Sequence, residues 1–327
     1  MADPFAGLVG QESAIALLRA AIAQDRLAPA YLFVGAAGIG RERAALGFCE
    51  LILRQGGALE RLARLGAQVR DRNHPDLLWV EPTYQHKGQL LSASEAVASG
   101  VQRRSLPKIR IEQVRAIAQF VARPPLAAAR SVVVVTGAEL MAESPANALL
   151  KTLEEPGRAI LILIAPSADV LLPTLVSRCQ RVPFHSLGRE DLARVLQQVG
   201  RAELLEQPTV LALAQGSPGA ALAAAAQLEV IDAEVLAQLR SPPSVPLAAL
   251  HLAKQVAQAL DVAAQVWLLD YLQHQYWQDF LQAGWVRSPL PLLDRARDQL
   301  LHYVQPRLVW ECLLLALRDC RAGSVAQ

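Results

Sequence analysis

The sequence predicts an α/β domain followed by all-helical domains, and three observations support this fold class. Short apolar runs rich in β-branched residues alternate with helical patterns through the first half, as in a parallel sheet covered by helices on both faces. After Phe184 the strand-like runs end, and segments rich in alanine and leucine continue with helical spacing. The length of 327 residues exceeds one hydrophobic core, which stops growing near ~250 residues, so several domains are expected.

Five apolar runs are expected to form the strands of this sheet. Such strands lack polar alternation because both of their faces are covered, and the run of valines at 132–135 is the clearest case. The expected strands are 31–34, 77–81, 131–136, 160–165 and 179–184. Helices on both faces of these strands would make the domain doubly wound.

One helix, between the third and fourth of these strands, is marked at both ends. Ser144 is expected to cap its free N–H groups, Pro145 suits its first position, and Pro156 followed by Gly157 stops it. Apolar residues within it recur at i, i+3, i+4 and i+7, which predicts one stripe packed on the sheet. The stripe consists of Ala146, Leu149, Leu150 and Leu153.

The segment 83–108 is polar and lacks clear periodicity, so it is expected to be an exposed connection with one short helix around 93–98. Basic residues gather at its end, and they form either a local DNA-binding patch or a solvated loop. We favour the loop, because no aromatic residues or nucleic-acid motif accompany the charges. These residues are Arg103, Arg104, Lys108 and Arg110.

The composition excludes several classes of protein. A net charge of +2 is too weak for a self-sufficient nucleic-acid binder. The four cysteines lack the spacing of a disulfide scaffold or of paired metal ligands, which indicates reduced thiols in a cytosolic protein. The N-terminus has no export signal, and every apolar run is far shorter than the ~20 residues that span a membrane. We therefore expect a cytoplasmic protein without membrane contact.

A glycine-rich string follows the first expected strand and opens a helix, which is the context of a phosphate-binding loop. Its candidate residues are Gly35, Gly38, Gly40 and Arg41. A working loop continues with lysine and then serine or threonine, which reach the terminal phosphates and the magnesium ion. Here a wide planar arginine takes the lysine position, and Glu42 would put negative charge beside the phosphates. The loop is expected to bind nucleotide weakly or not at all, with binding without turnover as the alternative.

A second defect follows the valine-rich strand, where phosphate-loop ATPases carry the metal-supporting acid and the catalytic base. The chain continues there with Thr136, Gly137, Ala138 and Glu139, so no carboxylate pair ends the strand. Glu139 is a displaced acid, for which a surface or capping role is expected. Both defects predict that the chain does not hydrolyse ATP.

Two motifs, in this order, closely resemble those of bacterial clamp-loader AAA+ subunits. They are the string ANALLKTLEEP at 146–156 and Ser-Arg-Cys at 177–179. The segments 9–11, 30–33 and 216–219 are also similar to that family. The resemblance covers the sheet domain and the helical unit after it, and extends to the last part only through length and helical character.

The resemblance implies an AAA+ P-loop NTPase-like fold in three domains. These are a RecA-like α/β domain with a degenerate loop at 1–186, a small helical lid domain at 187–238, and a C-terminal helical collar for oligomerisation at 239–327. Aromatic residues of the third domain are expected to pack within a helical bundle or its interface. They are Trp267, Tyr271 and Trp277.

Within this family the gamma or tau motor subunits keep a complete phosphate loop, whereas delta prime subunits often have a degenerate one. The chain is more similar to the delta prime branch, because Ala165 replaces a polar sensor and no arginine sensor stands near Gly219. The resemblance implies a non-hydrolysing component of the DNA polymerase III clamp loader without a cofactor; an ATP-hydrolysing gamma or tau subunit is the alternative. The expected partners are gamma or tau and delta subunits and, through the complex, the sliding clamp and primed-template DNA.

Arg178 matches the Ser-Arg-Cys arginine that family members supply to the ATP site of an adjacent subunit. The resemblance therefore implies an arginine finger acting in trans, which stabilises charge on the γ-phosphate during phosphoryl transfer. Many relatives also carry four zinc-binding cysteines between the first helix and the second strand. Residues 54–76 contain no cysteine, and His74 cannot hold zinc alone, so no zinc is expected.

Overall fold

The computed structural model describes residues 3–55, 59–99, 106–281, 288–302 and 304–321. The chain forms two compact units. The first unit consists of Met1–Ala93 and Pro107–Leu222, and the second of Ser94–Leu106 and Ala223–Gln327. The division into three domains at residues 186 and 238 stays a prediction.

A five-stranded parallel sheet forms the centre of the first unit, with the strand order β2-β5-β6-β1-β7. Its strands are β1 (Ala30–Val34), β2 (Leu77–Val80), β5 (Ser131–Val135), β6 (Ala159–Ala165) and β7 (Gln180–Pro183). All five predicted strands are confirmed, each to within one residue at either end. The α/β fold class predicted for this part of the chain is therefore confirmed.

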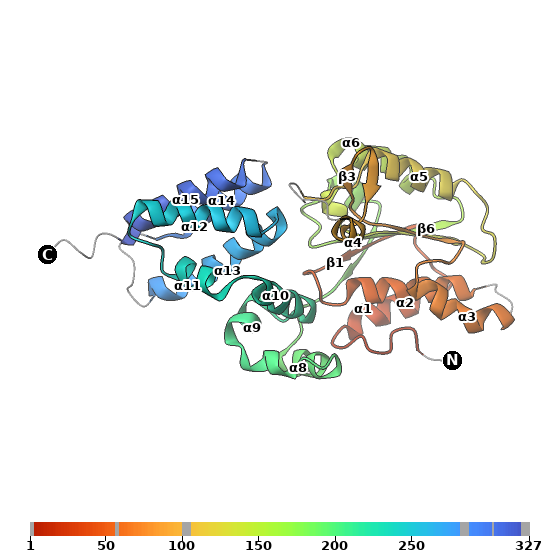
Figure 1. Ribbon diagram of the computed structural model, residues 1–327. Coiled ribbons are helices and arrows are strands. Elements are labelled where there is room, and N and C mark those ends of the chain that lie inside the picture. The colour runs from red at the N-terminus through yellow and green to blue at the C-terminus, as the bar shows by residue number, and fades with distance from the viewer. Residues whose placement is uncertain (1–2, 56–58, 100–105, 282–287, 303, 322–327) are drawn as a thin grey trace. The chain divides into compact units, whose positions relative to one another are not determined.

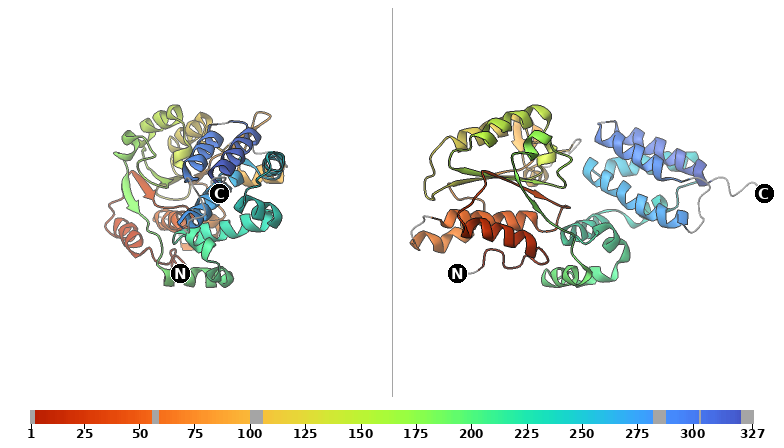
Figure 2. Two further views of the ribbon diagram at one scale, coloured as in Figure 1. Left: turned by 90° about the vertical axis from the view of Figure 1, so that its left-hand side faces the viewer. Right: turned by 180° about the vertical axis from the view of Figure 1, so that it is seen from behind.

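Helices cover both faces of the sheet. On one face lie α1 (Glu12–Ala23), α2 (Arg41–Arg54) and α3 (Leu59–Arg70), and on the other α5 (Ile111–Val121) and α6 (Glu143–Glu154) (Figure 1). The view from behind shows the same three layers (Figure 2). The domain is doubly wound, as predicted.

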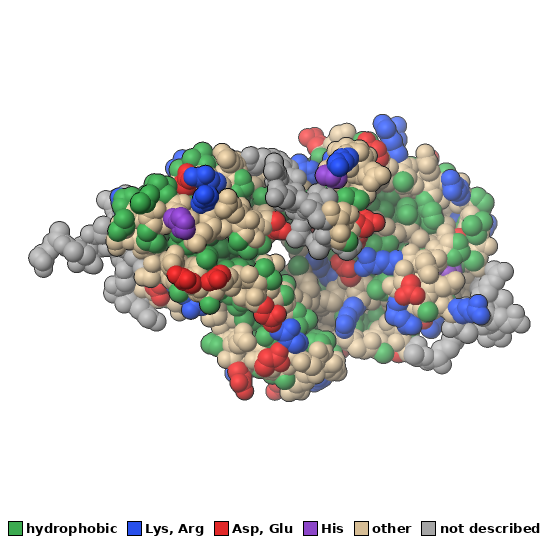
Figure 3. Space-filling model, in the orientation of Figure 1, with side chains coloured by type: hydrophobic (Ala, Val, Ile, Leu, Met, Phe, Trp, Pro, Cys, Tyr) green, Lys and Arg blue, Asp and Glu red, His purple; other side chains and the backbone are tan. Residues whose placement is uncertain are grey.

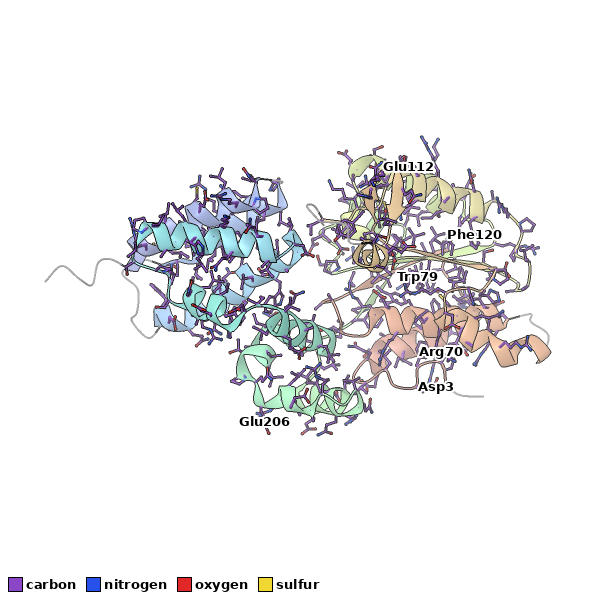
Figure 4. All side chains as sticks on the ribbon, in the orientation of Figure 1. Asp3, Arg70, Trp79, Glu112, Phe120 and Glu206 are labelled. Atoms are coloured by element: carbon purple, nitrogen blue, oxygen red, sulfur yellow. The ribbon has the colours of Figure 1, made fainter. Side chains whose placement is uncertain are left out.

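The valine strand β5 contributes to the core on both faces. Val132 and Val134 pack in the cluster with α1 and α2, whereas Val133 and Val135 pack in the cluster with α5 and α6. Every residue of β5 is buried, and its four valines are apolar on both faces of the sheet, as a strand covered on both sides requires. Labelled side chains mark the layers in Figure 4, where Arg70 lies with α3 and Phe120 lies on α5.

The start of α6 differs from the prediction, because the helix begins at Glu143 and its cap residue makes no side-chain hydrogen bond. Met141 pairs with Ile109 in an isolated parallel bridge, which fixes the backbone just ahead of the helix. Ser144 is therefore already helical, and Pro145 lies in the first turn, where its missing N–H would have had no partner anyway. The predicted stripe is confirmed, with Ala146, Leu149 and Leu153 buried and Leu150 partly buried.

The connection between β2 and α5 contains a short antiparallel hairpin that the sequence analysis missed. Its strands are β3 (Tyr84–His86) and β4 (Gln89–Leu91). Lys87 and Gly88 join them with φ angles of 48° and 83°, as a tight two-residue hairpin turn requires. The predicted short helix is confirmed as α4 (Ala93–Ala98). Arg103 and Arg104 lie outside the described residues.

Short elements complete the first unit. They are η1 (Ala138–Leu140), α7 (Pro173–Val176), α8 (Arg189–Gln198), η2 (Ala202–Glu206) and α9 (Pro208–Ala214). Helix α10 (Pro218–Val230) begins in this unit and ends in the second. The part of the chain after β7 is helical, as predicted.

The second unit is a helical bundle with a buried aromatic core. Its helices are α11 (Ala233–Arg240), α12 (Pro246–Ala259), α13 (Val262–Leu281), α14 (Leu290–Leu301) and α15 (Pro306–Arg321). Tyr271 is fully buried and stacks on Trp267 with 5.6 Å between ring centroids, so both pack as predicted. Trp277 is 41% exposed and stacks on Phe280 with 6.1 Å between ring centroids, so the predicted role at an interface stays a prediction.

Hydrophobic side chains also reach the surface of this unit (Figure 3), including Val245, Leu247 and Leu308. Within the described ranges, no helix is both long and apolar enough to cross a membrane.

Candidate functional site

The glycine loop lies where β1 ends and α2 begins, at the carboxyl edge of the sheet. Gly35, Gly38 and Gly40 have φ angles of 150°, 77° and 107°, which residues with a Cβ atom adopt only under strain. The N–H of Gly35 donates to the carbonyl of Pro166, which follows β6, over 3.1 Å. The glycines thus form a tight turn between β1 and α2 that other residues would adopt only under strain, and nucleotide binding by this loop stays a prediction.

The start of α10 packs directly on this loop. The N–H of Gly219 donates to the carbonyl of Gly38 over 3.0 Å, and Ser217 Oγ donates to the carbonyl of Ala37 over 2.6 Å. A Cβ atom at Gly219 would lie only 2.5 Å from the Cα of Gly38, so the two backbones are in direct contact. At this point no space is left between the loop and α10.

Gln11 also holds the loop, and sequence reasoning assigned no role to Gln11 or to Ser217. Gln11 is 3% exposed, and its side chain donates to the carbonyls of Ile39 and His185 and accepts from the N–H of His185. Ser217 is also buried and accepts from the N–H of Ala220, which makes it the capping residue ahead of Pro218. A serine followed by proline at a helix start is a signal that could have identified Ser217. Gln11 lies in the segment 9–11, on which part of the family resemblance rests, but no local pattern indicated its contacts with the loop.

Arg41, the residue at the lysine position, shares its surroundings with acidic groups. Burial lowers the pKa of Arg41, whereas the charges of Glu139 and Glu42 act in the opposite direction. Neither Arg41 Nη1 nor Glu139 Oε2 is exposed, and neither has a hydrogen-bond partner in the described part of the chain. The positive charge of the loop is therefore already opposed by two carboxylates of the same chain.

Glu139 does not have the surface or capping role expected of it. The short turn η1 at the end of β5 brings its carboxyl group inward, and this burial raises its pKa. The charge of Arg41 counteracts this rise. Glu139 thus lies near the loop. The residues directly after β5 still lack the pair of carboxylates that a hydrolytic site would have.

Glu42 takes the position of the metal-binding hydroxyl, and its carboxylate is engaged by Arg72. The Arg72 guanidinium lies 3.3 Å from Glu42 and 3.3 Å from Glu81, and it stacks over the ring of Trp79 at 4.1 Å. A carboxylate held in this way is a poor substitute for a hydroxyl that binds magnesium beside phosphates.

A cavity of about 290 Å³ adjoins the loop. It is lined mainly by apolar side chains and by the loop residues, among them Leu8, Val9, Leu187, Val195, Leu222 and Arg41. Its volume is at the lower limit of small-molecule pockets, which span about 300–1,000 Å³.

Arg178 lies at the opposite edge of the sheet. Gln180 at the start of β7 pairs with Tyr31 near the start of β1, so Arg178 precedes the strands whose far ends carry the loop. Because β1 is five residues long, at about 3.3 Å per residue the two edges are about 16 Å apart. The structure therefore does not bring Arg178 together with Gly35, Gly38, Gly40 and Arg41.

The Arg178 guanidinium is held by groups at this amino edge. Its Nε and Nη2 donate to Glu154 Oε1 over 3.0 and 2.6 Å, and its Nη1 donates to the carbonyl of Thr174 over 3.0 Å. The side chain remains 37% exposed. The next residue, Cys179, packs against the core, and burial raises the pKa of its thiol to about 11.

The other residues singled out from the sequence, His74, Lys108 and Arg110, make contacts that support the fold. His74 is buried and its Nδ1 accepts from the N–H of Asp76 over 3.1 Å. No group of three or more histidine, cysteine or acidic residues that could hold a metal is found among the described residues, and the absence of zinc stays a prediction. Lys108 pairs with Thr83 through the backbone, and Arg110 is the capping residue of α5.

Two family models match the chain. The model described as DNA polymerase III, delta subunit matches residues 10–188. The model described as cyanobacterial DNA polymerase III delta prime, C-terminal domain matches residues 190–317.

Among curated proteins, the chain is similar to DNA polymerase III subunits. It is 35% identical to subunit delta' from Pseudomonas aeruginosa over 58% of this chain and 54% of that protein. It is 31% identical to subunit delta' from Bacillus subtilis over 58% and 52%, and 25% identical to subunit tau from Bacillus subtilis over 62% and 32%. The chain thus spans about half the length of the delta' relatives that it matches.

Among solved structures, a DNA polymerase III gamma subunit-related protein from Thermotoga maritima aligns with 94% of this chain and 99% of its own, with a TM-score of 0.47 and 19% identity. A RuvB structure from Thermotoga maritima aligns with 92% and 87%, with a TM-score of 0.43 and 12% identity.

Proposed function

Because the chain belongs to the DNA polymerase III delta-subunit family and matches its delta prime members, we propose that it is a clamp-loader subunit that assists ATP hydrolysis in a neighbour. In this proposal it does not hydrolyse ATP itself. Its contribution is Arg178, which reaches the ATP site of an adjacent gamma- or tau-type motor subunit as an arginine finger.

The observation that carries this proposal is the separation of Arg178 from the glycine loop of its own chain. With about 16 Å of β-strand between the two edges of the sheet, the guanidinium cannot serve a nucleotide in its own loop. If Arg178 acts on a phosphate, that phosphate belongs to another chain. An exposed arginine at the amino edge of the sheet suits such a contact.

The surroundings of the loop support the absence of hydrolysis. Arg41 is opposed by Glu139 and Glu42, and Glu42 is paired with Arg72 where a metal-binding hydroxyl would be needed. The contact between Gly38 and Gly219 narrows the space beside the loop. These features support weak or absent nucleotide binding and no turnover, and the proposal includes no cofactor.

Assembly with the motor and delta subunits is the second part of the proposal. One relative is named DNA polymerase III subunit tau, which supports a motor of that type as the partner. We assign oligomerisation to a collar at 239–327, whose exposed apolar side chains would be covered in a complex. They include Val245, Leu247, Leu281 and Leu308. The sliding clamp and primed-template DNA would be met through the complex.

The test is ATP turnover by the reconstituted complex with clamp and primed DNA. In this complex the motor subunits carry alanine at their own arginine-finger positions. Most of the remaining ATP turnover then comes from the site that would receive Arg178. Arg178→Ala should lower turnover by about 10³-fold, because an arginine finger contributes 10³–10⁵ in rate. Arg181→Ala, which removes an exposed arginine of β7, is the matched control and should leave turnover unchanged.

Gel filtration checks assembly in the same experiment, and the isolated chain should show no magnesium-dependent turnover. A chain ending at Ser241 serves as the assembly-deficient reference. Unchanged turnover in Arg178→Ala would remove the proposed role in trans. Loss of assembly in that variant would make Arg178 an interface residue instead.

A further inference from the structure

The hydrogen bonds of Arg178 leave a defined part of its guanidinium unused. An arginine has five N–H donors, one on Nε and two on each terminal nitrogen. Glu154 accepts from Nε and from Nη2, and the carbonyl of Thr174 accepts from Nη1. The contact to Ser177 Oγ, at 3.5 Å, is too long for a good hydrogen bond.

By this count one N–H remains on Nη1 and one on Nη2. Glu154 Oε1 accepts from both Nε and Nη2, so it lies on the side that these two nitrogens share, and the remaining Nη2 N–H points toward the end of the planar group. An N–H donor at that end can bind an oxygen of a phosphate group. Arg178 can meet a phosphate without releasing Glu154.

The position of Glu154 is unfavourable for the helix that carries it. Glu154 is the last residue of α6, where the partial negative charge of the helix end disfavours a carboxylate. In its ion pair with Arg178, the arginine side chain is 37% exposed and the Glu154 side chain is 50% exposed, and ion pairs this exposed add little to stability. Neither α6 nor the fold as a whole has much to gain from this residue.

The buried stripe of α6 fixes where Glu154 lies. Ala146, Leu149 and Leu153 anchor the helix on the sheet, and α6 also contacts α7, which precedes Arg178. The carboxylate is thus held by a rigid element, whereas the arginine side chain has several rotatable bonds. A fixed acceptor at 2.6 Å restricts the arginine to few orientations before any phosphate arrives.

We propose that Glu154 is a positioning residue for Arg178, which presets the guanidinium for the phosphate of the neighbouring subunit. The proposal rests on the proposed function of Arg178 and adds a residue to it. Glu154 does not touch the nucleotide. It acts on the rate of phosphoryl transfer through Arg178, without changing how tightly the neighbour binds ATP.

The experiment uses the complex whose motor subunits lack their own fingers, with clamp and primed DNA. Glu154→Gln keeps the size of the side chain and removes the charge that holds Nε and Nη2. It should lower kcat about 10-fold, because misplacing a reacting group costs up to about 10²-fold, and it should leave KM for ATP unchanged. Glu155→Gln, at the exposed neighbouring position, is the matched control, and its kcat should stay within about twofold of that of the unchanged chain.

The double variant separates positioning from an independent role. In the Arg178→Ala background, Glu154→Gln should cause no additional loss, since there is then no guanidinium to position. An additional loss, an unchanged or raised kcat in Glu154→Gln alone, or failed assembly of that variant would each overturn the inference. Failure of the proposed function has a different signature, namely unchanged turnover in Arg178→Ala itself, and would overturn both.

Discussion

At the scale of single residues, the two edges of the sheet differ in how many of their hydrogen-bonding groups already have partners within the chain. Around the glycine loop, Gln11 and Ser217 bind backbone carbonyls, and Arg72 holds Glu42. At the other edge, Arg178 keeps two N–H groups after all of its short hydrogen bonds are counted. At the edge that carries the glycine loop these groups bind other parts of the same chain, whereas at the opposite edge Arg178 retains N–H donors.

The thiol next to Arg178 allows a test of how firmly this edge is packed. Burial raises the pKa of Cys179 from 9.0 to about 11, so the stability gained from the neutral thiol is complete below about pH 9 and lost as the pH rises through about 11. At pH 8 the folded protein should therefore carry thiolate at about 10⁻³ of this site. In a variant with Cys179 as its sole cysteine, alkylation at pH 8 should be at least about 10-fold slower in the folded than in the unfolded chain.

Mass spectrometry after timed alkylation gives both rates, and the folded rate should rise about 10-fold per pH unit between pH 8 and 10. A variant with Cys312, an exposed cysteine, as its sole thiol is the control and should react readily when folded. Equal rates for Cys179 in the folded and unfolded chains would show that this edge is open.

Single residues also mark the limits of what the sequence predicts. Arg41 and Glu42 were recognisable because they depart from a local motif. The pairing of Glu42 with Arg72 joins residues 30 positions apart, and no local pattern reports such a contact. The burial of the Glu139 carboxyl group likewise depends on the short turn η1. The sequence predicted where strand β5 ends, but it did not predict this turn.

At the scale of elements, strands buried on both faces were the most predictable feature. A continuous apolar run has few alternatives in a covered sheet, so β5 and β6 follow closely from their sequences. The start of α6 could not be predicted from its own sequence, because the bridge between Met141 and Ile109 fixes the backbone just ahead of the helix. The β3–β4 hairpin was missed because strands of three residues are too short to show alternation.

The contact between the glycine loop and α10 gives a prediction about stability. Gly219→Ala places a Cβ atom 2.5 Å from the Cα of Gly38, so one of the two backbones has to move. Overpacking of this kind costs about 1–3 kcal/mol in the free energy of unfolding. Denaturant unfolding followed by tryptophan fluorescence measures the loss.

Gly188→Ala is the matched control, because its added Cβ atom meets nothing within 4 Å. It should change the free energy of unfolding by less than about 0.5 kcal/mol. If Gly219→Ala were no more destabilising than Gly188→Ala, the loop and α10 would not be packed together in solution.

At the scale of the whole molecule, strand β1 separates the glycine loop from the edge of the sheet to which we assign the arginine finger. Five residues of β1 separate the loop from the edge that carries Arg178, so changes at Arg41 and Glu42 leave the arginine edge intact. A chain that cannot hydrolyse ATP can therefore still present an arginine to a neighbour. The collar assigned to 239–327 would hold that neighbour in place.

The most direct test of this account is the structure of the assembled complex with a γ-phosphate analogue bound to the motor subunits. We expect the end of the Arg178 guanidinium within about 2.7–3.2 Å of the analogue in the neighbouring subunit, with Glu154 still bound to its side. The glycine loop of this chain should hold no nucleotide. An Arg178 that faces solvent in the complex, or a nucleotide with magnesium in this chain's own loop, would contradict the account.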